Sequence, residues 1–351
     1  MFNYLAKVGR KPWSQAIVPL VAGVSATGYI GVHMFGHQVV RNLFIAQTPD
    51  GTLDQLSPDL CELIKKVYHE ISPVYNIPTM KVASYVPPKA TITWFCTSLM
   101  DPINLGMTEN RKGVLIGLPS YYNYTKPEDV PSSVFQFRKV SLFKMPKKQE
   151  KNEQIDAQDL LDREQCPPGE LIPVDLNSPA AKDYINSLVL SDEAKMFSVA
   201  RELFMGDSYR PLAKSGLIFG SITFSVQLSR AVVIILRLRE AHITQRMAMY
   251  MMSAVAGFVC YALLGDMIEQ YFVRKADEKA MSVSSTYRQG AKEYFNKIMQ
   301  RNRALRDLSE TFQVVYDKDG EVVEPLLRFK HMPLKDRLKF AEEPDEGETK
   351  S

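Results

Sequence analysis

Two long stretches without a charged residue constrain the fold of this chain more than any other feature. No Lys, Arg, Asp or Glu occurs in residues 13–40 or in residues 247–264. A helix needs about 20 mainly apolar residues to cross the hydrocarbon core of a bilayer. We therefore predict transmembrane helices at residues 15–38 and 246–265. The first is too long for the core of a signal peptide, so we expect it to remain in the mature protein.

A third apolar segment lies between these two. Residues 215–229 are uncharged but short, and Lys214 and Arg230 flank them. The segment crosses a bilayer only if the Lys214 side chain reaches the interface or if Arg230 is tolerated inside. We predict a third transmembrane helix at residues 211–236, with a helix that lies in the membrane interface as the alternative.

Basic residues predict the orientation of these helices. The leader, residues 1–14, contains three basic residues and no acid, and the connector from Arg230 to Arg246 contains four arginines against one glutamate. Short basic segments favour the positive-inside face of a membrane. With three spans, residues 41–205 and the chain after residue 265 lie on the opposite face. With two spans, the C-terminal part changes sides.

The polar part between the first two predicted spans mixes helix and strand patterns. Residues 60–71 have apolar positions at helical spacing, and residues 110–119 form a turn pattern followed by a buried strand pattern. A further helix is expected after Ser191, which is a good N-cap residue. We predict an α+β domain over residues 41–205. Within it, residues 144–170 are polar, flanked by proline and free of aromatic residues, which predicts a mobile surface insertion.

The chain after the last apolar segment is predicted to be mainly helical. We expect a helical C-terminal region at residues 266–340, with one long helix over about residues 267–308. A β-hairpin is expected at residues 314–323, because the Asp-Gly pair that ends at Gly320 favours a tight turn. The acidic tail at residues 341–351 is expected to be disordered.

Composition excludes several classes of function. The 43 basic and 40 acidic residues give a formal net charge of +3, which provides no basic field for nucleic acid. The four cysteines form no CxxC pair, which excludes the usual zinc-ribbon and thioredoxin motifs, and a disulfide among Cys61, Cys96 and Cys166 stays open. His33 and His37 have i, i+4 spacing, but two histidines without further ligands favour the lipid–water boundary over a metal site.

Small residues recur at four-residue spacing in two of the predicted membrane helices. This spacing allows helices to approach closely in lipid. We expect these positions to pack within the molecule, with an interface to another membrane protein as the alternative. The helix-packing candidates are Gly23, Thr27, Gly31, Gly216 and Gly220.

The helix after Ser191 resembles, by its position, the active-site helix of membrane zinc peptidases of the HtpX type, which carries HExxH. In that motif two histidines hold Zn²⁺ and the glutamate activates water. In this chain Arg201 and Met205 stand at the two histidine positions, and only Glu202 matches. A guanidinium and a thioether do not replace two imidazoles, so the first two metal ligands are lost.

The third metal position is also changed. After the membrane hairpin, these peptidases supply a glutamate ligand four residues before an aspartate, whereas this chain has Val273 and Asp277. The resemblance implies a degenerate zincin-like metallopeptidase fold. In such a fold Glu202 would form a structural ion pair with Arg201 or Lys275.

Four further stretches match one family more specifically. They are residues 188–203, 253–263, 290–308 and 327–333. On these stretches the chain resembles the transmembrane protein 177 family of the mitochondrial inner membrane. The resemblance implies a factor of cytochrome c oxidase biogenesis that binds and stabilises the chaperone of newly made subunit II.

We therefore expect a multi-pass α-helical protein of the mitochondrial inner membrane, with about three transmembrane helices and residues 41–205 facing the intermembrane space. The expected partners are oxidase subunit II, its assembly chaperone and the bilayer. We expect no enzyme and assign no catalytic, cofactor-binding or metal-binding residue. One alternative is a divergent membrane-embedded metallopeptidase-like hydrolase that uses Glu202 and Asp277. The other is a transporter subunit with Lys214 and Arg230 along a polar path.

Overall fold

The computed structural model describes most of the chain. The predicted insertion at residues 144–170, Cys166, most of the leader and the tail beyond residue 343 lie outside the described residues. The described residues are 12–35, 37–46, 54–75, 92–108, 113–131, 135, 177–238, 240–325 and 328–343.

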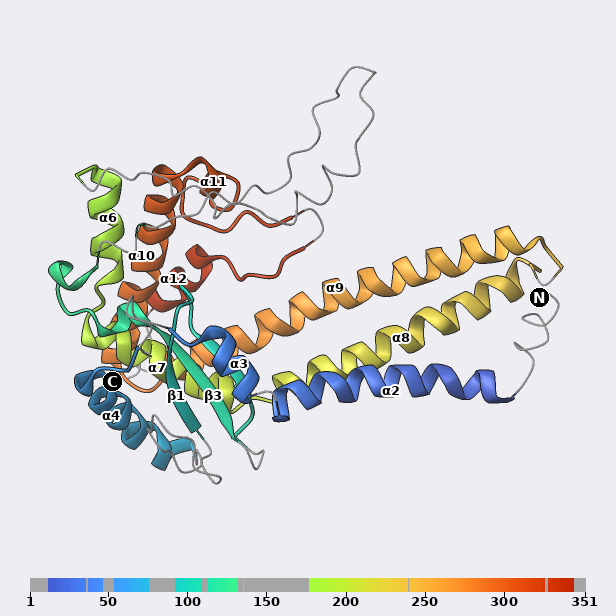
Figure 1. The fold of residues 1–351 in the computed structure, drawn as a ribbon, viewed down its shortest axis with the longest axis horizontal. Helices are drawn as coiled ribbons and strands as arrows, with labels where there is room; N and C mark the ends of the chain where they lie inside the picture. Colours follow the sequence, from blue (N-terminus) through green and yellow to red (C-terminus); the bar gives the residue numbers. More distant parts are fainter. Residues whose placement is uncertain are drawn as a thin grey trace, which may run out of the picture. The chain divides into compact units, whose positions relative to one another are not determined.

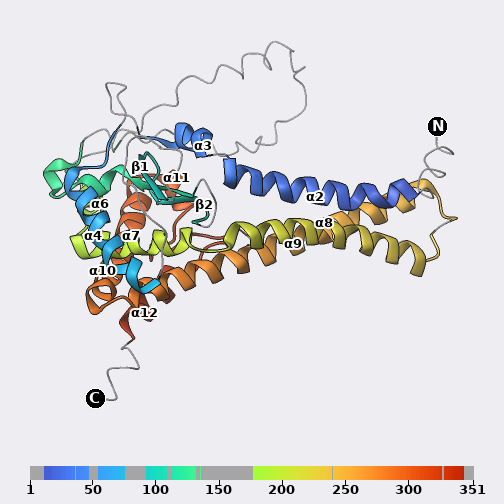
Figure 2. The ribbon, with the colours of Figure 1, turned by 90° about the horizontal axis from the view of Figure 1, so that it is seen from below.

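Three long helices lie side by side and form a bundle (Figures 1 and 2). They are α2 (Pro12–Phe35), α8 (Arg210–Ile235) and α9 (Ile243–Met281), and α8 contacts both of the others. Among the described helices, α8 and α9 are long and apolar enough to cross a membrane, whereas α2 contributes a shorter apolar stretch at Val18–His33. The start of α2 and the turn between α8 and α9 lie at the same end of the bundle, away from the sheet (Figures 1 and 2).

The third helix of the bundle extends well beyond the predicted span. A span was expected at residues 246–265, but α9 continues without a break to Met281. Residues 266–281 contain neither glycine nor proline and are rich in good helix formers, so nothing ends the helix at the membrane edge. One helix links the apolar bundle directly to the polar part of the protein.

The long helix expected over residues 267–308 is divided in two. α9 ends at Met281, and α10 (Ser285–Leu308) begins after a short Ser-Val-Ser segment. Serine side chains compete for the helix backbone groups, and valine loses side-chain freedom in a helix, so this segment is a weak point. The Ser282 amide donates to the Glu278 carbonyl and closes the end of α9.

A small mixed sheet forms the core beside the bundle. The strand order is β1 (Ile92–Thr97), β3 (Val114–Pro119), β2 (Ile103–Gly106), with β1 parallel and β2 antiparallel to β3. All residues of β1 and β3 are buried, which is typical of apolar, β-branched strands covered on both faces. The buried strand expected after the turn pattern within residues 110–119 is thus present as β3.

Helix α7 (Asp192–Gly206) packs between the sheet, α9 and a further helix, α4 (Pro58–Tyr75). Ser191 caps α7 by accepting a hydrogen bond from the Ala194 amide, as expected from the sequence. Apart from Arg201, every residue of α7 from Ala194 to Gly206 is buried. A helix that is buried on nearly all sides makes each polar side chain on it costly unless it is paired.

The described chain forms two compact units that the expected domain 41–205 does not match. One unit combines residues 1–123, 191–295 and 324–351, and therefore holds the bundle, the sheet and α7. Its remaining elements are α4, the first half of α10, α3 (His37–Phe44), η1 (Ser120–Asn123) and α12 (Leu334–Glu342). Residues 124–190 belong to the other unit, so sequence order alone did not indicate the boundary.

The second unit joins residues 124–190 to residues 296–323. Its described elements are η2 (Pro127–Asp129), α6 (Pro179–Leu188), the second half of α10 and α11 (Glu310–Gln313). At the expected hairpin, Tyr316 pairs with Val322 in an antiparallel bridge. Gly320 has a φ of 84°, a conformation that glycine adopts at little cost, and its carbonyl accepts a hydrogen bond from Asn302.

Candidate functional site

The structure brings three of the five degenerate metallopeptidase positions, Arg201, Glu202 and Asp277, to one place in the first unit. Arg201, Glu202 and Met205 lie on α7, and Asp277 lies on the polar end of α9. The Arg201 guanidinium is 2.9 Å from Glu202 Oε1 and 3.0 Å from Asp277 Oδ1. The fifth position, Val273, is one turn earlier on α9 and is half-buried.

A second arginine, which sequence reasoning missed, completes this cluster. Arg337 of α12 donates from Nε and Nη2 to the two carboxylate oxygens of Asp277, at 2.7 and 2.9 Å. Its guanidinium also lies over the Phe295 ring, 4.4 Å from the ring centroid. Arg201, Glu202, Asp277 and Arg337 together form what we call the ion-pair quartet.

The quartet is buried and carries no formal net charge. Side-chain exposure is 4% for both carboxylates, 10% for Arg337 and 13% for Arg201. Burial opposes the charge on Arg201, but the neighbouring Glu202 and Asp277 outweigh it and hold the pKa of this guanidinium above its ordinary value. Two cations and two anions at contact distance offset the desolvation that would otherwise make such a site prohibitive.

Polar contacts along α7 hold this helix in place. Asn104 of β2 donates through its side chain to the Glu202 carbonyl at 2.8 Å. The Tyr122 and Ser198 hydroxyls are 2.6 Å apart, and burial is the main cause that raises the pKa of Tyr122. At the start of α7, Ser191 donates through its amide and hydroxyl to the Glu293 carboxylate.

This chemistry differs from that of a hydrolytic metal site. Both carboxylates already accept hydrogen bonds from guanidinium groups, and Met205 is buried with only a thioether to offer. Within the described ranges, no group of three or more His, Cys, Asp or Glu side chains gathers at metal-binding distance. The quartet joins α7, α9 and α12 by strong, directional bonds, and Lys275 lies instead near the Tyr271 ring.

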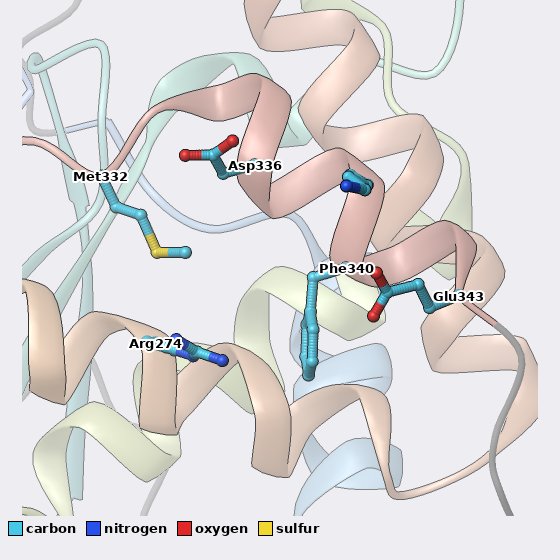
Figure 3. Close-up of a pocket in the computed structure, with 6 residues that line it drawn as sticks. Arg274, Met332, Asp336, Phe340 and Glu343 are labelled. Carbon is cyan, nitrogen blue, oxygen red and sulfur yellow. The ribbon is translucent and has the colours of Figure 1, made fainter.

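A shallow pocket opens beside the quartet, between α9 and α12. Its volume is about 270 Å³, and Figure 3 shows Phe340 pointing from α12 toward α9. The Arg274 guanidinium lies 5.9 Å from the Phe340 ring centroid and pairs with Glu278 at 2.9 Å. The lining residues are Arg274, Met332, Asp336, Lys339, Phe340 and Glu343. Cations and acids are mixed along this lining, so it does not favour a ligand of one charge.

The small residues of the membrane helices face away from their neighbours. A Cβ atom added at Gly23, Gly31, Gly216 or Gly220 would meet no described atom within 4 Å. Close packing occurs at Gly257 instead, where an added Cβ would lie 1.6 Å from the Ser225 hydroxyl of α8. Among the described residues, no neighbouring helix therefore comes within this distance of the four glycines, and their use as packing positions stays a prediction. Thr27 is exposed and bonds to the Gly23 carbonyl of its own helix.

The two histidines are not on one helix. α2 ends at Phe35, and α3 begins at His37, so the i, i+4 argument for His33 and His37 does not apply. His33 Nδ1 accepts a hydrogen bond from the Gly106 amide at 3.4 Å. His33 thus connects the end of α2 to strand β2.

Comparison with known proteins places the chain in one family. The family described as TMEM177, transmembrane protein 177, matches residues 86–343. Transmembrane protein 177 of Xenopus laevis is 26% identical over 317 residues, which cover 89% of this chain and 88% of the relative. The Homo sapiens protein is 26% identical over 325 residues, with the same two shares. The Danio rerio protein is 30% identical over 152 residues, or 42% of this chain and 48% of the relative.

No solved structure gives a significant match, so the zincin-like fold stays a prediction. The match to the family covers both the membrane hairpin α8–α9 and the three elements that form the ion-pair quartet. On this match, the chain belongs to the transmembrane protein 177 family.

Proposed function

We propose that this protein is a non-catalytic scaffold of the mitochondrial inner membrane that binds newly made cytochrome c oxidase subunit II together with its chaperone. The observation that carries the proposal is the open small-residue face of α8, at Gly216 and Gly220. The other two helices of the bundle, α2 and α9, contact α8 at other positions. The polar part, which α9 joins to the bundle as one continuous helix, would hold a partner in a fixed orientation.

The small-residue face fits another membrane helix better than lipid alone. Glycines at four-residue spacing let two helix backbones approach closely, which strengthens packing where no hydrophobic driving force exists between helices. The chain already uses this device internally, because Gly257 packs against Ser225. At Gly216 and Gly220 the same geometry is present without an occupant among the described residues.

The mitochondrial part of the proposal rests on different support. The leader at residues 1–14 is basic and free of acids, a composition compatible with import into mitochondria and with retention on the positive-inside face. The role in oxidase assembly comes from the family resemblance of the sequence. We infer that residues 41–205 face the intermembrane space, because with three spans they lie opposite to the leader.

The rival hydrolase function has weaker support. Its best argument is that Glu202 and Asp277 both contact Arg201 and therefore lie near each other, as an active-site arrangement would require. Each carboxylate is held by arginine, however, and a metal would have to displace a buried guanidinium. Metal analysis of the purified protein distinguishes the two candidate functions. Stoichiometric zinc supports the hydrolase, whereas partner binding without zinc supports the scaffold.

The test of the scaffold is a pair of membrane-face variants expressed in mitochondria. Gly216→Leu with Gly220→Leu fills the open face of α8, and Ala248→Leu with Ala254→Leu adds similar bulk to exposed positions of α9. Each tagged protein is immunoprecipitated in mild detergent after pulse-labelling of mitochondrial translation. We expect the glycine variant to lose newly made subunit II and its chaperone while the alanine variant retains both. Equal recovery of subunit II with both variants contradicts the proposed face.

A further inference from the structure

The domain-side edge of the hydrocarbon core can be located along the α8–α9 hairpin. The uncharged stretch of α9 ends at Gly265, after about 28 Å of helix at 1.5 Å per residue, which matches the thickness of a bilayer core. A Cβ on Gly265 would lie 3.5 Å from the Leu217 side chain of α8. The edge therefore runs at the level of Leu217 and Gly265, and Asp266 is the first charged residue outside it.

The acids directly outside this edge are neutralised by partners. Asp266 accepts two hydrogen bonds from Arg328, at 2.7 and 2.8 Å. One turn further, Glu269 pairs with Arg210 at 2.9 Å and also with Lys214 of α8. Paired charges are expected where a protein surface adjoins a low-dielectric medium, because an isolated carboxylate there is costly.

The Asp266–Arg328 pair also fixes a short loop at this height. The Phe329 amide donates to Asp266 Oδ2 at 3.1 Å, and the Gln270 side chain donates to the Phe329 carbonyl. The backbone of this loop is thus tied to α9 on both sides of Phe329. The Phe329 side chain is nevertheless 63% exposed. An exposed aromatic ring on a backbone fixed in this way marks a contact surface where further exposed apolar side chains lie beside it.

The face of α9 next to this loop is apolar as well. Met267 and Tyr271 follow Leu264 at i+3 and i+7, so the three side chains share one helix face. Their exposed fractions are 47% for Leu264, 65% for Met267 and 57% for Tyr271. Lys275, one turn further, is exposed with its ammonium 5.9 Å from the Tyr271 ring centroid. Along the helix the order is aliphatic, aromatic, basic.

We propose that Met267, Tyr271 and Phe329 form an interfacial anchor that inserts into the headgroup region of the bilayer on the side of the sheet. The headgroup region is roughly 5–8 Å deep on each side of the core. Met267 stands about 3 Å beyond Gly265 along the helix, and the Tyr271 backbone about 9 Å, just past this depth. Helix side chains tilt toward the N-terminus, which for α9 is the membrane side, so the Tyr271 ring reaches back to the outer limit of the headgroup region. Aromatic rings are favoured at this depth, and lysine beyond them reaches the phosphates.

Lipid is the occupant that this position favours. The anchor is continuous with the lipid-facing surface of α9 through Leu264, and the same helix carries both. Its effect is to set the height of the polar part above the membrane, since Phe329 precedes α12 and its quartet arginine by only a few residues. This inference does not depend on the proposed function, because it concerns lipid contact alone.

Site-specific photo-crosslinking tests the anchor in proteoliposomes of phosphatidylcholine and phosphatidylglycerol. Benzoylphenylalanine replaces Phe329, a conservative change at an exposed ring. The same residue at Phe258, which is 65% exposed in the middle of α9, reports contact with the core, and at the exposed Lys339 of α12 it reports the aqueous side. After irradiation, mass spectrometry measures the mass shift of each labelled peptide.

The proposal predicts a phospholipid mass shift in the peptides labelled at positions 258 and 329 and no such shift in the peptide labelled at position 339. A lipid adduct at 258 with none at 329 overturns it. A crosslink from position 329 to protein alone, whether a second copy or a partner, overturns it equally, because the exposed ring then belongs to a protein interface.

Discussion

Asp277 accepts hydrogen bonds from Arg337 and lies at ion-pair distance from Arg201, which itself pairs with Glu202. Within the quartet, each side chain is therefore balanced by at least one group of opposite charge. Burying such charges contributes little stability compared with apolar packing, but removing one partner leaves another uncompensated. Single substitutions here report on the balance of charge rather than on one contact.

Replacing Arg337 by methionine is expected to destabilise the fold strongly. The change keeps much of the apolar bulk but leaves one excess negative charge on Glu202 and Asp277, two groups with 4% exposed side chains. Breaking a buried pair in this way costs about 3–5 kcal/mol. Thermal unfolding of the detergent-purified variant should show a large fall in Tm.

A double variant provides the control for this prediction. Arg337→Met with Asp277→Asn leaves Arg201 and Glu202 as a neutral pair at 2.9 Å. Its stability should exceed that expected from adding the two single effects, since the excess charge is gone. Strict additivity would show that the four side chains do not act as one electrostatic unit.

Cys96 is expected to resist alkylation in the folded protein. It is 2% exposed, and its thiol donates to the Asp54 carboxylate at 3.3 Å. Burial, reinforced by the neighbouring Asp54, raises the pKa of the Cys96 thiol. Because the thiolate is the reactive form, raising the pH from 7 to 9 should accelerate maleimide labelling of an ordinary exposed thiol and leave Cys96 nearly unlabelled.

Peptide mass spectrometry measures this labelling before and after denaturation. Cys96 should react only once the protein is unfolded, while the half-buried Cys61 serves as an internal reference. If Cys96 were labelled in the native protein as fast as Cys61, strand β1 would not be buried as the structure shows.

At the scale of elements, α8 and α9 are held together at one close crossing. An added Cβ on Gly257 would lie 1.6 Å from Ser225 Oγ and 3.2 Å from the Ser221 carbonyl oxygen. The Ser225 hydroxyl bonds to that same carbonyl at 2.8 Å, so the side chain cannot move aside without losing its partner. The crossing therefore depends on the absence of a side chain at residue 257.

Gly257→Leu is expected to separate the hairpin and to destabilise it by about 1–3 kcal/mol, as overpacking does in a closely packed contact. Gly220→Leu is the matched control, because an added Cβ there meets no described atom within 4 Å. Thermal unfolding in detergent should show a lower Tm for Gly257→Leu and an unchanged Tm for Gly220→Leu. Equal losses in both variants would mean that Gly220 also packs within the molecule.

Elements with local signals were predictable from the sequence. Helix α7 follows its Ser191 cap, α4 its apolar spacing and β3 its apolar run. The end of α9 could not be predicted in this way. Charged residues show where the apolar span ends, but they do not end the helix. Arg337 was not found because α12 reaches Asp277 only through tertiary packing, and the available signal was the need of a buried carboxylate for a cation.

At the scale of the whole molecule, the first unit assembles segments from the start, middle and end of the chain. α2 and the α8–α9 hairpin lie together, although more than 170 residues separate α2 from α8. The Ser215 hydroxyl of α8 donates to the Ala26 carbonyl of α2 at 3.0 Å, a direct bond between them. Long-range pairing of this kind has no local sequence signal, which is why the predicted domain 41–205 and the observed units differ.

The arrangement of the bundle leads to a topology that three cysteine variants can test. The start of α2 and the α8–α9 turn share one end of the bundle, while α4, the sheet and α12 lie at the other (Figures 1 and 2). With three spans, Gln55→Cys and Asp336→Cys are on one face of the membrane and Glu240→Cys is on the other. All three native residues are exposed.

Labelling of mitoplasts with an impermeant maleimide, compared with the parent protein, should therefore reach positions 55 and 336 and reach position 240 only after detergent is added. If α8 instead lay in the interface, positions 55 and 240 would react alike and position 336 would differ from both, and the small-residue face of α8 would have no membrane helix to meet.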